Sequence, residues 1–281
     1  MIWALKICAK IVLARLPVSY RLWKAVGIFR HGRMDVAGYS ARIFKLHADR
    51  AYPNGLPRGA VILELGPGDS IASAVIAKAH GVARSYLVDV GSFAIDDVRI
   101  YQALAVSLKQ LGLLSPDLSQ ANSFEDVLQQ RNAEYMTNGL LSLKSIPSGS
   151  IDFVWSHSVL EHVRKHELAD VLKELKRILK PNGFASHNID FQDHLAGALN
   201  NLRFSESVWE SSLFAQSGFY TNRIPAVTMH RMFWDVGFKI EREEFGQWPQ
   251  LPTRRGALHS DFKTYRDEEL MNRTSHVLLR L

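Results

Sequence analysis

The sequence contains a single cysteine, no internal repeat or low-complexity tract, and no acidic residue before position 35. One thiol, Cys8, cannot form an internal disulfide framework, which excludes a disulfide-stapled secreted scaffold and fits a reducing, cytoplasmic compartment. Three basic residues interrupt the apolar residues 1–16 before about 20 apolar residues can accumulate, so this segment is not a transmembrane helix. The composition, 47% hydrophobic and 22% charged over 281 residues, indicates one elaborated globular domain.

The first 34 residues are strongly basic. They contain seven Lys or Arg residues and no acid, a charge of +7, whereas the remaining chain has 27 basic and 28 acidic residues, or −1. Lys6 and Lys10 share one face of a helix over residues 1–16, which suits peripheral contact with the anionic inner face of a membrane, and residues 20–29 could begin a second such segment. Packing as a lid over a ligand site is the favoured alternative. Nucleic-acid binding is the least favoured, because no RNA-binding motif accompanies the charge.

A glycine-containing loop follows the most strand-like segment of the chain. The short apolar run Val61–Leu65 is typical of a parallel strand that is buried on both faces, yet it contains one carboxylate, Glu64. Gly66 and Gly68 follow directly, and glycine lets the backbone pass close to a bound molecule. Ile71 stands where a dinucleotide-binding loop, G-x-G-x-x-G, has its third glycine. The segment therefore predicts a ligand loop that differs from the NAD-binding kind.

The charge of Glu64 separates two kinds of nucleotide ligand. A carboxylate two residues before Gly66 would repel a diphosphate but attract an ammonium or sulfonium group. S-adenosylmethionine carries both of these cationic groups. Residues 64–68 resemble the first motif, E-x-G-x-G, of the class I S-adenosylmethionine-dependent methyltransferases. The resemblance implies that Glu64, Gly66, Pro67 and Gly68 bind this cofactor.

Two further strands carry polar residues where that family needs them. Residues 85–89 predict a second strand that ends in Asp89, 23 residues after Gly66. A carboxylate there can accept hydrogen bonds from the ribose hydroxyls, although NAD enzymes share the spacing. A third strand is expected at Glu134–Thr137, and the resemblance places the following Asn138 against the adenine amino group.

The block Ile151–Val163 closely resembles the fourth-strand motif of the family, D-x-V-x-S-x-x-x-L-E-H. It adds Ser156 and His157 to the expected cofactor-binding residues. His157 lies just beyond the carboxyl end of a parallel strand, where ligands bind in open α/β sheets. Glu161 and His162 are interpreted as structural residues that brace the loop.

The segment after the fifth strand concentrates titratable side chains. His187, Asp190, Asp193 and His194 lie within eight positions. A general base, assigned to His187, Asp190 or His194, would remove a proton as a substrate hydroxyl attacks the methyl group, because a hydroxyl cannot ionise unaided near neutral pH. A cap for a helix near Leu195 is the second interpretation. A divalent metal held by carboxylate and imidazole is the third, and no residue is assigned to it.

Residues 190–224 predict a helical lid that determines the acceptor. Aromatic faces and bidentate donors are mixed there, which suits a sugar or an anionic acceptor. The residues concerned are Arg203, Phe204, Trp209, Phe214, Phe219, Tyr220, Asn222 and Arg223. The alternative interpretation is a lid that uses the aromatic side chains as its own core.

The remaining segments predict the other elements of a class I sheet. A helix is expected to continue through Lys173–Lys180 and to stop at Pro181, followed by a fifth strand at Phe184–His187. A helix at Val227–Val236 should end at Gly237. The expected antiparallel edge strands are Phe238–Glu243 and His276–Leu281, and further helices are expected at 35–51 and on both sides of a break at 115–117.

These observations predict an α/β protein with a Rossmann-like, doubly wound seven-stranded sheet, a β-hairpin edge, N-terminal helices and a helical lid. Residues 1–57 would form a basic amphipathic cap, and residues 58–281 a methyltransferase domain with insertions at about 91–132, 190–224 and 247–272. The expected activity is O-methylation of a small-molecule, sugar or glycan-type acceptor with S-adenosylmethionine as cofactor. The alternative is a catalytically silent scaffold that binds a partner or a membrane surface.

Overall fold

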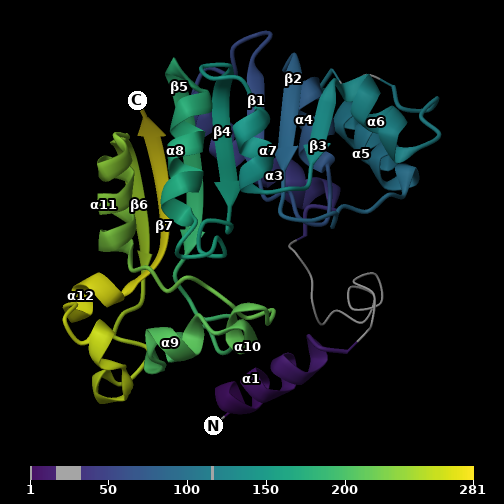
Figure 1. Ribbon diagram of the computed structural model, residues 1–281. Helices are drawn as coiled ribbons and strands as arrows, with labels where there is room; N and C mark the ends of the chain where they lie inside the picture. Colours follow the sequence, from purple (N-terminus) through teal and green to yellow (C-terminus); the bar gives the residue numbers. More distant parts are fainter. Residues whose placement is uncertain (1, 17–32, 115–116) are drawn as a thin grey trace.

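A computed structural model describes residues 2–16, 33–114 and 117–281, and its centre is a seven-stranded sheet with the order β3-β2-β1-β4-β5-β7-β6 (Figure 1). The strands are β1 (Val61–Leu65), β2 (Arg84–Val88), β3 (Ala133–Met136), β4 (Ile151–His157), β5 (Leu179–Asp190), β6 (Lys239–Gln247) and β7 (Asn272–Arg280). Strands β1 to β5 are parallel, and β7 is antiparallel to both β5 and β6. The strand order reverses between β1 and β4, so a ligand crevice is expected at their carboxyl ends.

Helices cover both faces of this sheet (Figure 1). The α-helices are α1 (Ile2–Leu13), α3 (Ala37–Ala51), α4 (Ala72–Ala79), α5 (Val98–Gln110), α6 (Phe124–Arg131), α7 (Leu140–Ser145), α8 (Leu168–Ile178), α9 (Glu206–Trp209), α10 (Ser212–Ala215), α11 (Ala226–Val236) and α12 (Asp267–Leu270). Short 3-10 turns lie at Asn200–Arg203, Arg255–Ala257 and Ser260–Phe262. Helices α3 to α6 pack on one face of the sheet, and α7, α8 and α11 pack on the other.

The central strands feed two separate apolar cores, because successive side chains of a strand point to opposite faces. Ile62 and Phe153 pack with the α3–α6 layer, whereas their neighbours Leu63 and Val154 pack with the α7, α8 and α11 layer. All four side chains are almost completely buried. Continuous apolar strands such as β1 and β4 are therefore stable only in the middle of a doubly covered sheet, which confirms the predicted fold.

The boundary between α8 and β5 differs from the predicted one. The helix ends at Ile178 rather than at Lys180, and β5 begins at Leu179, which has an extended ψ of 136° and pairs with Ile151. The carbonyl of Ile178 accepts a hydrogen bond from the amide of Ser150 at 2.9 Å instead of continuing the helix. Strand pairing with β4, rather than Pro181, therefore ends the helix.

Other predicted elements agree with the structure, with shifted ends. Helix α11 ends at Gly237, whose φ of 90° requires glycine or a strained residue. The edge strands β6 and β7 pair antiparallel as expected, and residues 248–271 connect them, where an insertion was predicted at about 247–272. The proposed second N-terminal segment at residues 20–29 lies outside the described residues, as do residues 115–116 of the expected helix break.

The lid and the N-terminal helix pack together at one end of the sheet. Figure 1 shows α9 and α10 beside α1, beyond the end of β4. Ile7 of α1 is buried in an apolar cluster with Trp209 and Phe219. Lys6 donates a 2.7 Å hydrogen bond from Nζ to the carbonyl of Leu195. Among the described helices, none is long and apolar enough to cross a membrane.

Candidate functional site

The loop after β1 has a backbone that only glycine accommodates easily. Gly66 and Gly68 have φ values of 72° and 63°. A Cβ atom on Gly66 would lie 2.5 Å from the side chain of Val159. Val159 directly precedes residues 160–162, the L-E-H block of the fourth-strand motif. The amide of Gly66 donates to the carbonyl of Val88 at 2.8 Å, so this loop is held between β2 and the segment after β4.

Glu64 is a buried acid at the end of β1 that faces this loop. It is 3% exposed, and its carboxyl group accepts a hydrogen bond from the hydroxyl of Ser73 in α4. Burial raises the pKa of Glu64 to about 8, and the nearby Asp89 adds to the rise, whereas the Ser73 hydrogen bond opposes it. The protein therefore holds a neutral carboxylic acid here at pH 7, which a cationic ligand would convert to a carboxylate.

Asp89 connects the loops that follow β1 and β2. Its carboxylate accepts a hydrogen bond from the amide of Gly68 at 3.0 Å and another from the amide of Val90 at 2.7 Å. Its backbone carbonyl accepts from the amide of Gly139, which follows β3. The expected ribose acceptor thus stands in a fixed position. Asn138 is exposed in the loop after β3, and its backbone amide donates to the hydroxyl of Ser142 at 3.0 Å.

Ser156 and His157, both at the end of β4, have different environments. The hydroxyl of Ser156 has no exposed surface and lies 2.7 Å from Nδ1 of His187. The Ser156 side chain is therefore used within the core, next to His187. His157 is half-buried, and its Nδ1 lies 3.1 Å from Nε2 of His47 in α3.

His157 belongs to a cluster of histidines between α3 and the sheet that the sequence did not predict. His47 Nδ1 lies 2.8 Å from the hydroxyl of Ser186, which in turn lies 3.2 Å from Nε2 of His276. Burial lowers the pKa of both His157 and His276 to about 4, so both are neutral near pH 7. The histidines come from three segments far apart in the chain, and no local motif connects them.

His187, one of the predicted base residues, has a position that is incompatible with this role. Its side chain is completely buried and stacks with Phe233 of α11 in the core of the sheet. Burial and the neighbouring His276 lower its pKa to about 3. A base must reach the proton that it removes, and a core side chain cannot contact an acceptor.

Asp190 and His194, the other predicted base residues, line an open cavity of about 440 Å³. This cavity lies at the end of β5 and is bounded by residues 192–197 and by Lys6 of α1. The Asp190 carboxylate accepts hydrogen bonds from the backbone and side-chain nitrogens of Gln192, both at 2.9 Å. The His194 ring is half-buried and stacks on the ring of His162, with centroids 4.8 Å apart.

The second interpretation, a cap for a helix near Leu195, is wrong, because turns occupy residues 194–199 and the next 3-10 turn begins at Asn200; Asp193 instead holds these turns together. Its carboxylate accepts hydrogen bonds from the amides of Leu195, Ala196 and Asn200, at 3.0, 2.6 and 2.7 Å. The side chain is 3% exposed and is therefore used within the loop. Asp190 and His194 remain as the side chains that face the cavity.

The lid uses several of the predicted acceptor-binding residues for its own packing. Trp209 and Phe219 are at most 1% exposed and form an aromatic core. The buried guanidinium of Arg223 donates to the carbonyl of Phe204 at 2.7 Å and to the carboxylate of Glu206 at 2.8 Å. The structure thus favours the core interpretation for Trp209, Phe219 and Arg223.

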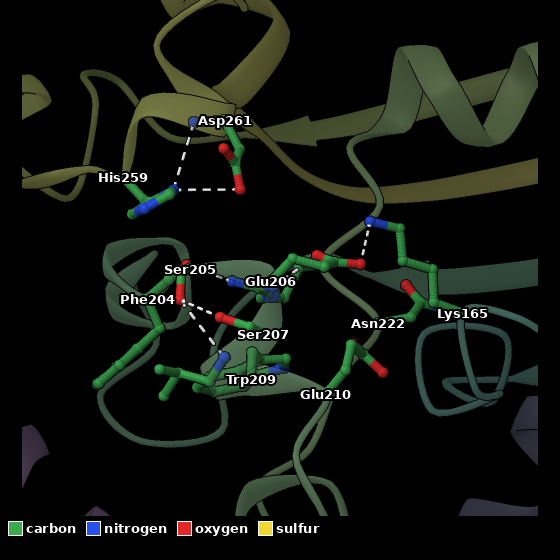
Figure 2. Close-up of polar contacts among 12 residues, drawn as sticks. Lys165, Phe204, Ser205, Glu206, Ser207, Trp209, Glu210, Asn222, His259 and Asp261 are labelled. Atoms are coloured by element: carbon green, nitrogen blue, oxygen red, sulfur yellow. Dashed lines mark hydrogen bonds and ion pairs between the residues drawn. The ribbon is translucent and has the colours of Figure 1, made fainter.

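The lid is also fixed to the L-E-H block. Figure 2 shows Lys165 reaching toward Glu206, with Nζ and Oε1 2.6 Å apart. The side-chain nitrogen of Asn222 donates to the carbonyl of Leu160 at 2.8 Å, and the amide of Asn222 donates to the carbonyl of Glu161 at 2.7 Å. The segment after β4 therefore connects the glycine loop with the lid.

Comparisons with known proteins agree with this architecture. Residues 63–186 match the model of a family described as a methyltransferase domain. Three solved structures of S-adenosylmethionine-dependent methyltransferases resemble the chain. The Methanosarcina mazei structure is 19% identical, with a TM-score of 0.49 over 82% of this chain and 96% of that one. The Archaeoglobus fulgidus structure is 12% identical, with a TM-score of 0.47 over 86% and 94%. The Mesorhizobium loti structure is 15% identical, with a TM-score of 0.46 over 89% and 100%. A search of curated proteins found no match.

The matched residues run from β1 to β5 and contain the glycine loop, Asp89 and the L-E-H block. Residues 63–186 therefore carry a methyltransferase domain, and the predicted family, enzyme class and cofactor agree with this match. The neutral Glu64, the fixed Asp89 and the close-packed glycines fit a nucleoside that carries positive charge.

Proposed function

We propose that this enzyme methylates an oxygen of a small-molecule, sugar or glycan-type acceptor. The observation that carries the proposal is the open cavity at the end of β5, in which Asp190 and the His194 imidazole flank a space of about 440 Å³. A volume of this order accommodates a small molecule or a few sugar rings. A carboxylate and an imidazole there suit an acceptor hydroxyl, which needs a group that takes its proton.

The cofactor-binding residues in this proposal are those of the glycine loop and its neighbours. Glu64 would face the methionine end of the cofactor, and Asp89 the ribose. The remaining residues are Gly66, Pro67, Gly68, Asn138 and His157, whereas the buried Ser156 is left out. When bound, the cofactor supplies an activated methyl group on a sulfonium, so the protein chiefly aligns the acceptor oxygen with the methyl carbon.

Asp190 is the residue that we assign to proton removal. It is the last residue of β5, its amide donates to Glu161 Oε1 at 3.2 Å, and it lines the cavity. His187 is excluded from this role by its burial. His194 lines the same cavity.

The test combines calorimetric titration with S-adenosylhomocysteine and a panel of hydroxylated acceptors, read out as S-adenosylhomocysteine release. Asp190→Asn should bind S-adenosylhomocysteine like the wild type but turn over an identified acceptor at least about 100-fold more slowly. Asp170→Asn, on the exposed surface of α8, is the matched control and should behave like the wild type. Methylation of amines alone would overturn the oxygen assignment. No S-adenosylhomocysteine binding would favour the silent scaffold instead.

We also propose that residues 1–34 contact an anionic membrane surface. Leu5 and Val12 of α1 are 73% and 60% exposed, and Leu16, just after the helix, is 45% exposed. Helix α1 therefore presents apolar side chains away from the lid. An apolar face next to a segment of charge +7 suits a peripheral contact with the headgroup region. Sedimentation of the protein with vesicles that contain anionic lipid tests this contact.

A further inference from the structure

Three side chains from two separate segments meet beside the acceptor cavity, and one of them, His194, lines it. Glu161 and His162 belong to the L-E-H block after β4, and His194 belongs to the loop after β5. One ligand atom of each lies within 4.8 Å of the others. Their burial is graded, because Glu161 is 2% exposed, His194 is half-buried and His162 is exposed. The group is thus open on one side only.

Two atoms of this group are buried with nothing to bond to among the described residues. Glu161 uses Oε1 to accept the amide of Asp190 at 3.2 Å, whereas Oε2 has no hydrogen-bond partner. Nε2 of His194 is likewise buried without a partner. A buried carboxylate oxygen without a donor destabilises the fold, because it has lost its hydrogen bonds to water and no protein hydrogen bond replaces them. A bound cation is one way in which such an oxygen is satisfied.

The third side chain has its ring orientation fixed by the lid. Nδ1 of His162 lies 2.8 Å from the carbonyl of Tyr220, so Nδ1 must carry the hydrogen in that bond. The neutral ring then has its lone pair on Nε2. A hydrogen bond from the second ring nitrogen to a backbone carbonyl is the arrangement that commonly orients metal-binding histidines.

We propose that Glu161, His162 and His194 bind a divalent transition-metal ion, with the cavity leaving further coordination positions open. Two imidazoles and one carboxylate form a donor set used for zinc and for other first-row metals, with metal–ligand bonds of about 2.0–2.2 Å. A tetrahedral site with such bonds has ligand atoms about 3.4 Å apart, so the three side chains need to contract only modestly from their present spacing. This assignment gives Glu161 and His162 a role beyond bracing the loop.

Charges around the group balance the incoming cation. Asp190 and Asp193 contribute electrostatically at His194, and Asp190 does so at Glu161. Lys10 faces the group from α1, with Nζ 3.4 Å from the carbonyl of His194, and burial followed by the nearby Lys6 lowers the pKa of Lys10. Lys6 also lines the cavity, so the three acidic residues Glu161, Asp190 and Asp193 face two lysines, and this excess of acidic groups favours a divalent ion.

The consequence for catalysis rests on the proposed function. An acceptor oxygen that enters the cavity would occupy an open coordination position, and the ion would lower the pKa of that hydroxyl. Asp190, beside Glu161, would then receive the proton. The metal would thereby explain how a weakly acidic hydroxyl becomes a nucleophile in a site whose fully buried histidine, His187, cannot serve as a base.

The experiment uses the untagged full-length chain after dialysis against a chelator. Titration with Co²⁺, followed by visible absorption, and calorimetric titration with Zn²⁺ should both give one ion per chain. Glu161→Gln preserves the shape of the side chain and should weaken binding at least tenfold, as should His194→Ala. His166→Ala, which removes an exposed imidazole four residues from His162, is the matched control and should leave affinity unchanged.

The outcomes separate this inference from the proposed function. If the wild type binds no Co²⁺ or Zn²⁺, or if Glu161→Gln and His194→Ala bind as tightly as the wild type, the metal site is wrong. S-adenosylhomocysteine titration of the same samples reports separately on the cofactor site and on whether each variant is folded. Metal binding that is lost in folded variants, with S-adenosylhomocysteine affinity unchanged, supports the site.

Discussion

At the scale of single residues, Glu64 shows how burial prepares a binding site for charge. Its raised pKa of about 8 means that the carboxyl group carries a proton at pH 7. S-adenosylmethionine brings a sulfonium and an ammonium group, which favour the ionised carboxylate. We therefore expect cofactor binding at pH 7 to release roughly one proton per chain. Calorimetric titrations in buffers of different ionisation enthalpy measure this release directly.

Glu64→Gln is the matched variant for this prediction, because it keeps the shape and removes the titration. It should bind S-adenosylmethionine more weakly and without dependence on the buffer. An observed heat of binding that is the same in every buffer for the wild type would contradict the prediction. It would mean that Glu64 is already ionised, or that it stays neutral beside the bound cofactor.

Residue spacing predicted which side chains come together on the proposed cofactor side of the site, but not on the acceptor side. Glu64 and Asp89 stand at strand ends, where chain order alone determines that they meet. His187 failed as a base because the sequence does not reveal which face of β5 packs under α11. The approach of His194 to Glu161 depends on how the loop after β5 folds back, which no local pattern encodes.

At the scale of elements, α1 has two faces with different partners. Ile7 is 5% exposed against the lid, whereas Leu5 is 73% exposed on the outer side. Ile7→Asp would bury an unpaired charge and lose about 1.5–3 kcal/mol of apolar burial, which should detach α1. Leu5→Asp should leave α1 docked but reduce binding to anionic vesicles. Hydrogen–deuterium exchange of α1 amides and vesicle sedimentation measure the two effects.

The two variants control for each other, since they introduce the same charge two residues apart, on opposite faces of α1. Equal exchange protection of α1 in both would mean that the Ile7 contact does not hold the helix. Unchanged vesicle binding of Leu5→Asp would refute the membrane contact proposed for this face. The sequence predicted the helix and its basic side but not its orientation, because Lys6 and Lys10 turn out to bond lid carbonyls.

At the scale of the whole molecule, buried histidines and buried acids have opposite effects on how the free energy of unfolding changes with pH. Burial lowers the pKa of His47, His157, His187 and His276. They remain neutral in the folded chain while the unfolded chain takes up protons below about pH 6.5, so their contribution is complete above that pH and is lost toward about pH 4. Glu64 and Glu161 have raised pKa values, so their contribution is present below about pH 4.5 and is lost as the pH rises.

These opposing effects predict that the cofactor-free protein is most stable near pH 6.5. From pH 6.5 to about 4.5 these histidines, together with His80 and His194, whose pKa values burial also lowers, outweigh the two acids. Stability therefore falls with acid, and each unmatched proton changes it by about 1.4 kcal/mol per pH unit. Between pH 6.5 and 8 only the acids titrate, so stability falls with base. Urea unfolding at pH 4.5, 6.5 and 8.5 measures the profile. His276→Gln should reduce the loss of stability between pH 6.5 and 4.5, whereas the exposed control His166→Gln should leave it unchanged. A free energy of unfolding that rises steadily toward pH 8.5 would show that Glu64 and Glu161 are ionised in the folded chain.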